Sequence, residues 1–248
     1  MSTTVRLQTD LSAFDGIIDT GTFKSDSRKV LSFLKESRDA ARIREVTPGA
    51  LAYLLARGLE SVKRSFLLVT STDREAERLA ETVSFYCAKD TARLDAAHNR
   101  SRVLYFPSRA GHKSQSLRKM EITARRMEVL YTLRGAPDPR IVVTSAAAVL
   151  ERLIPPRILM DHTEYRVRGE MIDVDQLCRN LADRGYYHVS LVEEYGDFSR
   201  RGGVLDVFSP LYRWPLRLEF FGDELESVRL FHPSTQRSLG TLEDVQLL

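Results

Sequence analysis

Hydrophobic and polar positions alternate most regularly between Gly196 and Ser238. Three short apolar-rich segments in this stretch are separated by Gly, Pro and Asp at turn positions: Gly203 to Phe208, Pro215 to Phe221 and Leu225 to Phe231. Short apolar-rich runs bounded by turn residues are typical of consecutive antiparallel strands. The spacing therefore predicts an antiparallel meander in this part of the chain.

The middle strand of this meander places an aromatic side chain on a polar face. Successive strand side chains point to opposite sides of a sheet, so Leu218 and Phe220 share one face. Arg217, Glu219 and Phe221 share the other. A single exposed phenylalanine is common on protein surfaces, but aromatic and arginine side chains are also the usual anchors of protein interfaces. Both interpretations of Phe221 stay open at this point.

The turn after this strand constrains how the hairpin pairs. A two-residue loop at Gly222 and Asp223 would set Glu219 directly opposite Glu226. Like charges directly opposite each other destabilise a sheet. The sequence therefore predicts a longer loop or a bulge in this hairpin.

The chain before residue 155 has a different rhythm, in which continuous apolar runs alternate with amphipathic stretches. A first helix is expected from a cap at Asp26 and Ser27 to about Ala40, after a lead-in without a clear period. The alternation that follows predicts strands at residues 43–46, 66–69, 103–106 and 141–143, and helices from Pro48 and over 73–87, 120–133 and 146–153. Apolar strands alternating with helices indicate a parallel sheet with helices on its faces.

The segment Ile154 to Pro156 interrupts this alternation. Beyond it the pattern predicts one strand near residues 165–167, one helix over 173–184, and then strands only. We therefore expect an α/β domain over residues 1–155 and an α+β domain with an antiparallel sheet over residues 156–248.

Composition limits the classes of protein that remain. The 248 residues are 43% hydrophobic and 29% charged, which is typical of a soluble globular protein. No apolar run is long enough to span a membrane, and the N-terminus lacks the pattern of a secretory signal. Cys87 and Cys178 have no nearby cysteine, so we expect reduced core thiols rather than a disulfide or a metal site. These features predict a cytoplasmic protein that does not contact a membrane.

Charge favours a protein partner over a nucleic acid. The whole chain has a formal charge of only +3. From Gly196 onward, six arginines and eight carboxylates give a net charge of −2. A mixed surface of this kind suits a protein partner, because a phosphate backbone requires clustered cations.

The residues needed for nucleotide chemistry are missing where the first α/β unit would place them. A phosphate loop needs glycines, a lysine and a Ser or Thr hydroxyl, but the turn from Val46 to Leu51 has no lysine. The string Gly111 to Ser114 does not fit either, because no Gly stands before Lys113 at the required distance. The strand at residues 141–143 leads into Thr144 and Ser145 without a pair of carboxylates for a metal ion.

No other set of catalytic residues stands out. The five histidines occur singly, whereas metal sites have clustered ligands. Asp206 lies between two apolar residues of a strand, where we expect it to pair with an arginine such as Arg201. We therefore expect no catalytic residue, no metal and no cofactor.

Several motifs in one order carry a resemblance to a known family. They are GDFSRRGGVLDVF, PLRLEFFGDELESVRLF, STQRS, VLYFPS and RIVVTSAAAVLERLIPP. The first three resemble the end of the interaction domain shared by bacterial transcription-repair coupling factors and the excision-repair subunit UvrB. With Ser238 following Thr235 to Arg237, the third motif resembles the coupling factors more than UvrB. The resemblance covers nearly all of residues 40–248, and the chain departs from it in the loop at residues 108–117.

The resemblance implies an N-terminal fragment of a coupling factor: a degenerate helicase-like domain without a working phosphate loop, then a domain that recruits UvrA. It carries the UvrA-contacting residues over to Arg201, Arg217 and Phe221, with Arg200 as an adjacent candidate. Contacts with RNA polymerase and DNA, and ATP-driven translocation, would lie in other parts of such a protein, so no enzyme activity is expected here.

Two alternatives stay open. The first is a UvrB-like protein that binds ATP and damaged DNA, against which the missing lysine and the missing aromatic-rich hairpin argue. The second is nonspecific nucleic-acid binding through arginines of the first domain: Arg93, Arg100, Arg102, Arg109, Arg118, Arg125 and Arg126. Salt-dependent DNA binding would distinguish the second from the others.

Overall fold

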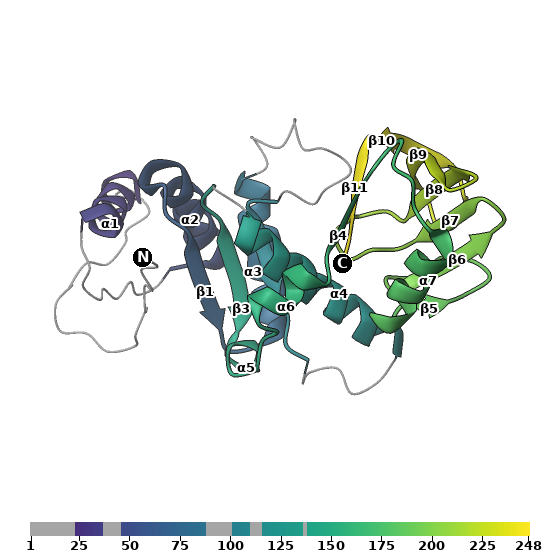
Figure 1. Cartoon of the computed structure of the whole chain (residues 1–248). Helices are drawn as coiled ribbons and strands as arrows, with labels where there is room; N and C mark the ends of the chain where they lie inside the picture. The colour runs from purple at the N-terminus through teal and green to yellow at the C-terminus, as the bar shows by residue number, and fades with distance from the viewer. Residues whose placement is uncertain (1–22, 37–45, 88–100, 110–115, 136–137) are drawn as a thin grey trace. The chain divides into compact units, whose positions relative to one another are not determined.

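The computed structural model describes residues 23–36, 46–87, 101–109, 116–135 and 138–248 (Figure 1). The chain forms two compact units, each assembled from separate segments. Of the described residues, unit 1 comprises 23–36, 46–87, 101–108 and 138–151, and unit 2 comprises 109, 116–135 and 152–248. Among the described residues, no helix is long and apolar enough to cross a membrane.

Unit 1 contains a three-stranded parallel sheet. Its strands are β1 (Phe66–Thr70), β2 (Val103–Phe106) and β3 (Ile141–Ser145), in the order β1-β3-β2. Its helices are α1 (Phe23–Glu36), α2 (Pro48–Val62), α3 (Asp73–Cys87) and the short α5 (Ala146–Val149). Apolar residues of α2, α3 and all three strands form one core. The predicted parallel sheet with packed helices is confirmed.

Two helices of unit 1 differ from the prediction. α1 begins at Phe23, one turn before the expected cap, so Asp26 and Ser27 lie inside it. The helix expected to reach residue 153 ends at Val149, because the chain tightens there into a bond from the Glu151 N–H to the Ala148 carbonyl. Pro155 and Pro156 follow, and a residue before proline avoids the helical region. The strand expected at residues 43–46 lies almost wholly outside the described residues.

Unit 2 is built on a six-stranded sheet (Figure 1). The strands are β5 (Tyr187–His188), β6 (Asp197–Arg201), β7 (Val204–Val207), β8 (Leu216–Phe221), β9 (Glu224–Phe231) and β10 (Ser238–Leu242). They lie side by side in reverse chain order from β10 to β5. The predicted antiparallel meander is confirmed for β7, β8 and β9. β6 and β10 extend it at its two sides, and the two-residue strand β5 pairs with β6 in parallel.

One face of this sheet forms the core of unit 2. Helix α7 (Val174–Asp183) begins at Asp173, whose side chain accepts a hydrogen bond from the Gln176 N–H at 2.8 Å. Its buried face packs with the alternate apolar residues of β7, β8 and β9 in one cluster. Full burial of each such aliphatic side chain contributes about 1.5–3 kcal/mol. The opposite face of the same strands carries polar side chains and a second, smaller apolar cluster that includes Phe208 and Phe231.

The remaining elements of unit 2 are β4 (Glu164–Val167), β11 (Asp244–Leu247), α4 (Ser116–Gly135) and α6 (Pro156–Asp161). β4 and β11 form a separate antiparallel pair. The Tyr131 hydroxyl of α4 donates to Gln246 Oε1 of β11 at 2.6 Å. The sequence division at residue 155 placed α4 in the first domain, whereas α4 groups with unit 2. Which segments fold independently stays a prediction.

Candidate protein-docking surface

The β8–β9 hairpin turns in two residues and contains a bulge. Phe221 pairs with Glu224 across Gly222 and Asp223, and Gly222 has a φ of 63°, which favours glycine. The register then shifts, so that Glu219 pairs with Ser227 rather than with Glu226. The Ser227 hydroxyl donates to the Glu219 carboxylate at 2.6 Å. The predicted bulge is thus confirmed, and it replaces a like-charge pair with a hydrogen bond.

The strand registers place the three predicted partner-binding residues on one face of the sheet. Asp206 of β7 lies opposite Arg217 of β8. Arg201 of β6 pairs with Val204, which in turn pairs with Glu219. Directly opposed residues point to the same side of a sheet. Because Glu219 lies midway between Arg217 and Phe221 along β8, Arg201, Arg217 and Phe221 share the face opposite the core.

Phe221 is the most exposed of the three, at 79% of its surface. Its neighbour Phe220 points into the core and is buried. The period-two alternation of β8 therefore continues to the last residue of the strand, and it leaves Phe221 in solvent beside a tight turn. An exposed aromatic ring in this position can dock without repacking the core.

Arg217 is held in place by other side chains of the sheet. Its Nε and Nη2 donate to the two carboxylate oxygens of Asp206 at 2.7 and 2.8 Å, and Nη2 also donates to Gln236 Oε1 at 3.0 Å. The guanidinium carbon lies 4.6 Å from the ring centroid of Phe231. The hydrogen bonds with Asp206 raise the pKa of Arg217. The side chain is only 21% exposed, so it contributes a fixed edge of the surface rather than a protruding contact.

Arg201 extends the same charge cluster into solvent. Its Nη2 lies 3.5 Å from Asp206 Oδ2, and its side chain is 59% exposed. The turn that follows depends on glycine, because Gly202 has a φ of 59°. A Cβ at Gly203 would lie 2.7 Å from the carbonyl oxygen of Phe220, which real side chains do not tolerate. The Arg201 turn is therefore packed directly against β8.

The chain is similar in sequence to proteins of known families. Residues 166–248 match the UvrB interaction domain family. The chain is 35% identical over 227 residues to a transcription-repair-coupling factor of Myxococcus xanthus, which covers 89% of this chain and 18% of that protein. Proteins of the same name from Bacillus subtilis and Escherichia coli are 28% and 29% identical over 88% and 82% of this chain.

The chain is a homologue of the transcription-repair coupling factors. The resemblance identified from its motifs is confirmed. The chain spans less than a fifth of the length of these coupling factors. The matched domain, which implies protein–protein interaction, contains the whole surface described above.

Arg200, the adjacent candidate, is separated from this surface. It alternates with Arg201 along β6 and pairs with Leu205 of the core face. Its guanidinium forms an ion pair with Asp175 at the start of α7. Arg200 therefore ties the helix to the sheet on the other side.

Two residues that organise the surface were missed or underestimated by the sequence analysis. Asp206 was expected to pair with an arginine such as Arg201, and Arg201 Nη2 does lie 3.5 Å from it. The shorter contacts of Asp206 are with Arg217, and Asp206 is only 2% exposed rather than half-buried. Gln236 was not singled out, although it holds Arg217 from the turn before β10. The signal for Asp206 was an acid between two apolar strand residues, and identifying its partner required the register.

The N-terminus of α2 in unit 1 is capped by the chain itself. Thr47 Oγ1 accepts a hydrogen bond from the Ala50 N–H at 3.2 Å. Pro48 has no N–H to offer. Of the three residues Pro48, Gly49 and Ala50 in the first turn, only Gly49 keeps an N–H that is not used in this cap.

The ends of β2 and β3, where open α/β sheets bind ligands, are closed by a polar network. The carboxylate of Asp73 accepts hydrogen bonds from the Ser108 N–H at 3.1 Å and from the Ser145 hydroxyl at 2.7 Å. The Ser108 hydroxyl also donates to Asp73. Ser145 in turn caps α5 through the Ala148 N–H. These side chains are thus committed to holding α3, β3 and α5 together.

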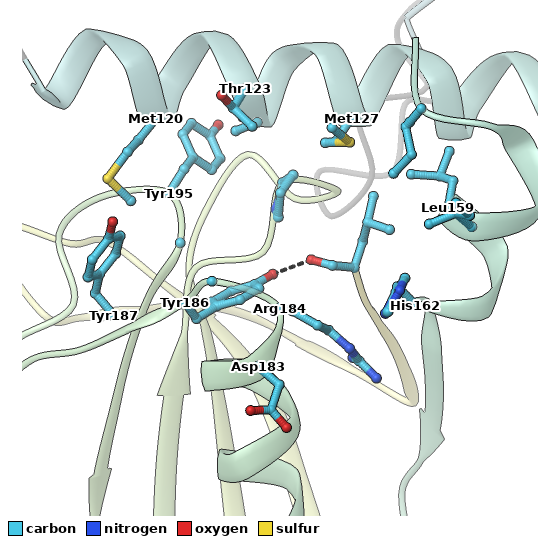
Figure 2. Close-up of a pocket in the computed structure, with 17 residues that line it drawn as sticks. Met120, Thr123, Met127, Leu159, His162, Asp183, Arg184, Tyr186, Tyr187 and Tyr195 are labelled. Carbon is cyan, nitrogen blue, oxygen red and sulfur yellow. Dashed lines mark hydrogen bonds between the residues drawn. The ribbon is translucent and has the colours of Figure 1, made fainter.

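Unit 2 also contains a cavity of about 530 Å³ (Figure 2). Met120, Thr123 and Met127 of α4 line one side of it, and Leu159 of α6 and the turn before β5 line the others. The Tyr186 hydroxyl in this turn already donates to the main-chain oxygen of Leu248. The methionines of α4 thus face the same cavity as apolar residues of α6 and the turn before β5.

Proposed function

We propose that this chain recruits UvrA in transcription-coupled nucleotide excision repair. The observation that carries the proposal is that Arg201, Arg217 and Phe221 lie on one face of the matched interaction domain, opposite its core. The names of its homologues, all transcription-repair-coupling factors, support the biological setting. A cytoplasmic location follows from this role.

The geometry suits the docking of a protein. Phe221 supplies an exposed aromatic anchor, and Arg201 supplies an exposed cation. The two residues are about 12 Å apart, at about 4.8 Å per strand and 3.3 Å per residue. Arg217 lies between Asp206, to which it is hydrogen-bonded, and Phe231, which packs with Val192 and Phe208. Its fixed position lowers the entropy that binding would cost.

We further propose that unit 1 is a degenerate P-loop domain that neither binds nor hydrolyses ATP. The turn at Thr47 to Leu51 lacks a lysine, Pro48 has no N–H, and the cap on α2 occupies the Ala50 N–H that a phosphate would need. The network at Asp73 uses the carboxylate that could otherwise approach a metal ion. Any contact with RNA polymerase or DNA is assigned to parts of the coupling factors that this chain does not span.

Calorimetric titration of the chain with purified UvrA tests the first proposal. We expect saturable binding that Arg201→Glu and Phe221→Ala each weaken by at least about 2 kcal/mol, the usual threshold for an interface hot spot. Arg57→Glu, which changes an exposed arginine of unit 1, is a matched control and should bind normally. Wild-type affinity in both docking variants would refute the proposal.

The alternative, a UvrB-like protein that binds ATP and damaged DNA, makes the opposite prediction. It requires saturable ATP binding by the same chain and tighter binding to damaged than to undamaged duplexes. The titration with ATP therefore separates the two functions independently of UvrA.

A further inference from the structure

A short segment after β4 continues the sheet beyond β9. Met171 forms an isolated antiparallel bridge with Glu224. The Leu225 N–H donates to the Glu170 carbonyl at 2.9 Å, and the Ile172 N–H donates to the Asp223 carbonyl at 2.8 Å. Bonds on either side of a residue pair define the close, non-hydrogen-bonded type of pairing, in which side chains approach most closely.

This pairing places Met171 in one row with Phe221. Glu224 is paired with Phe221 on one side and with Met171 on the other. All three side chains therefore point to the same side of the sheet. At about 5 Å between opposed residues, Met171 and Phe221 lie about 10 Å apart with Glu224 between them.

The side chain of Met171 is largely exposed and does not contribute to the core. It is 70% exposed, close to the value for Phe221, while its neighbour Ile172 is buried in the core of unit 2. Unbranched methionine side chains adapt well to partner surfaces. The row thus presents two large apolar groups in a line, both attached to backbone that hydrogen bonds hold rigid.

The charges around this row differ from those at Arg201. Asp223 and Glu224 are exposed and form no ion pair with any described residue. The surface therefore carries a cation at its β6 end and unneutralised carboxylates at its hairpin end. A partner that covers both ends needs an anionic and a cationic group, separated by apolar area.

We propose that the docking surface for UvrA extends across β9 to Met171, and that Glu224 pairs with a cation of UvrA between the apolar contacts of Met171 and Phe221. This inference rests on the proposed function. It is supported by continuity, because Met171, Glu224 and Phe221 are adjacent members of one sheet row and all lie inside the matched domain. From Arg201 to Met171 the surface spans four strand spacings, about 20 Å, which fits within a standard interface.

The test is a calorimetric titration of UvrA with variants of the whole chain. We expect Met171→Glu and Glu224→Lys each to weaken binding at least tenfold, and Met171→Leu to bind like the wild type. Leu239→Glu is the matched control. Leu239 is a half-exposed apolar residue of β10, and β10 pairs with the end of β9 that lies away from Glu224. Its affinity should stay within twofold of the wild type.

Thermal unfolding of each variant accompanies the titration. If Met171→Glu lowers the melting temperature, Met171→Ala replaces it, with an expected loss of at least threefold in affinity. Normal binding by the Met171 and Glu224 variants, together with weakened binding by Phe221→Ala, would show that the surface stops at Phe221 and would overturn this inference alone. Normal binding by the Phe221 and Arg201 variants as well would instead overturn the proposed function.

Discussion

Replacing Asp206 by Asn tests whether one buried carboxylate organises the docking surface. Asp206 receives two charge-assisted hydrogen bonds from Arg217 and lies within 3.5 Å of Arg201. The amide keeps the size of the side chain but removes its charge and one acceptor oxygen. The largely buried guanidinium of Arg217 would then face a neutral group.

The expected loss of stability follows from the burial of Asp206 and Arg217. Removing one partner from a fully buried ion pair costs about 3–5 kcal/mol. Arg217 keeps some contact with solvent, its hydrogen bond to Gln236 and its position over Phe231. We therefore expect Asp206→Asn to lower the free energy of unfolding by about 2–3 kcal/mol, at or just below the lower end of that range.

Equilibrium unfolding in urea measures this change, and titration with UvrA measures its effect on docking. Under conditions where the variant is folded, we expect at least tenfold weaker UvrA binding, because both arginines lose their common anchor. Asp175→Asn is the control. It removes the more exposed ion pair with Arg200 on the other face, and a pair of this kind contributes at most about 1 kcal/mol. A loss below about 0.5 kcal/mol in Asp206→Asn would refute the reasoning.

Four further outcomes are expected. Phe221→Ala should leave the melting temperature within about 2 °C of the wild type while UvrA affinity falls; a loss of affinity only in proportion to unfolding would make Phe221 a core residue. Gly203→Ala should destabilise unit 2 by about 1–3 kcal/mol in urea unfolding, because its Cβ would clash with the Phe220 carbonyl. The wild-type chain should show no saturable ATP binding by calorimetry, and a micromolar constant would contradict this. Burial raises the pKa of Tyr186. The stabilisation that the neutral Tyr186 side chain provides should therefore be complete below about pH 10, the ordinary pKa of tyrosine, and should decline as the pH rises above that value. If a Tyr186→Phe variant keeps the same decline, another group is responsible.

The sequence predicted the parts of this fold that depend on local periodicity. Alternation along β8 was sufficient to assign Phe220 to the core and Phe221 to the surface, because strand geometry leaves only two faces. The like-charge conflict at Glu219 was sufficient to predict a bulge. The motifs were specific enough to identify the family, because several of them occur in one order along the chain.

Pairings across strands could not be predicted in the same way. Arg217 contacts Asp206 of β7, Gln236 of the turn before β10, and Phe231 of β9. The burial of Arg217 therefore depends on several strand registers at once. Arg200 points to the opposite face of the sheet, where it forms an ion pair with Asp175. This ion pair depends on where α7 begins. The position of Met171 beside Glu224 depends on a single bridge that no sequence pattern marks. Likewise, α4 has a weak apolar period, so its grouping with unit 2 follows from tertiary contacts such as Tyr131 with Gln246.

The arrangement of β8 explains how one domain can keep a stable core and still change its docking surface. Leu216, Leu218 and Phe220 pack with α7, whereas Phe221 makes its contribution on the other face of the same strand. We therefore expect a substitution at Phe221 to alter binding without opening a cavity. Arg217 is the exception, because its guanidinium is packed against Phe231 and bonded to a buried carboxylate. Of the three proposed docking residues, we expect Arg217 alone to couple affinity to stability, so changes there should be less tolerated than changes at Arg201 or Phe221.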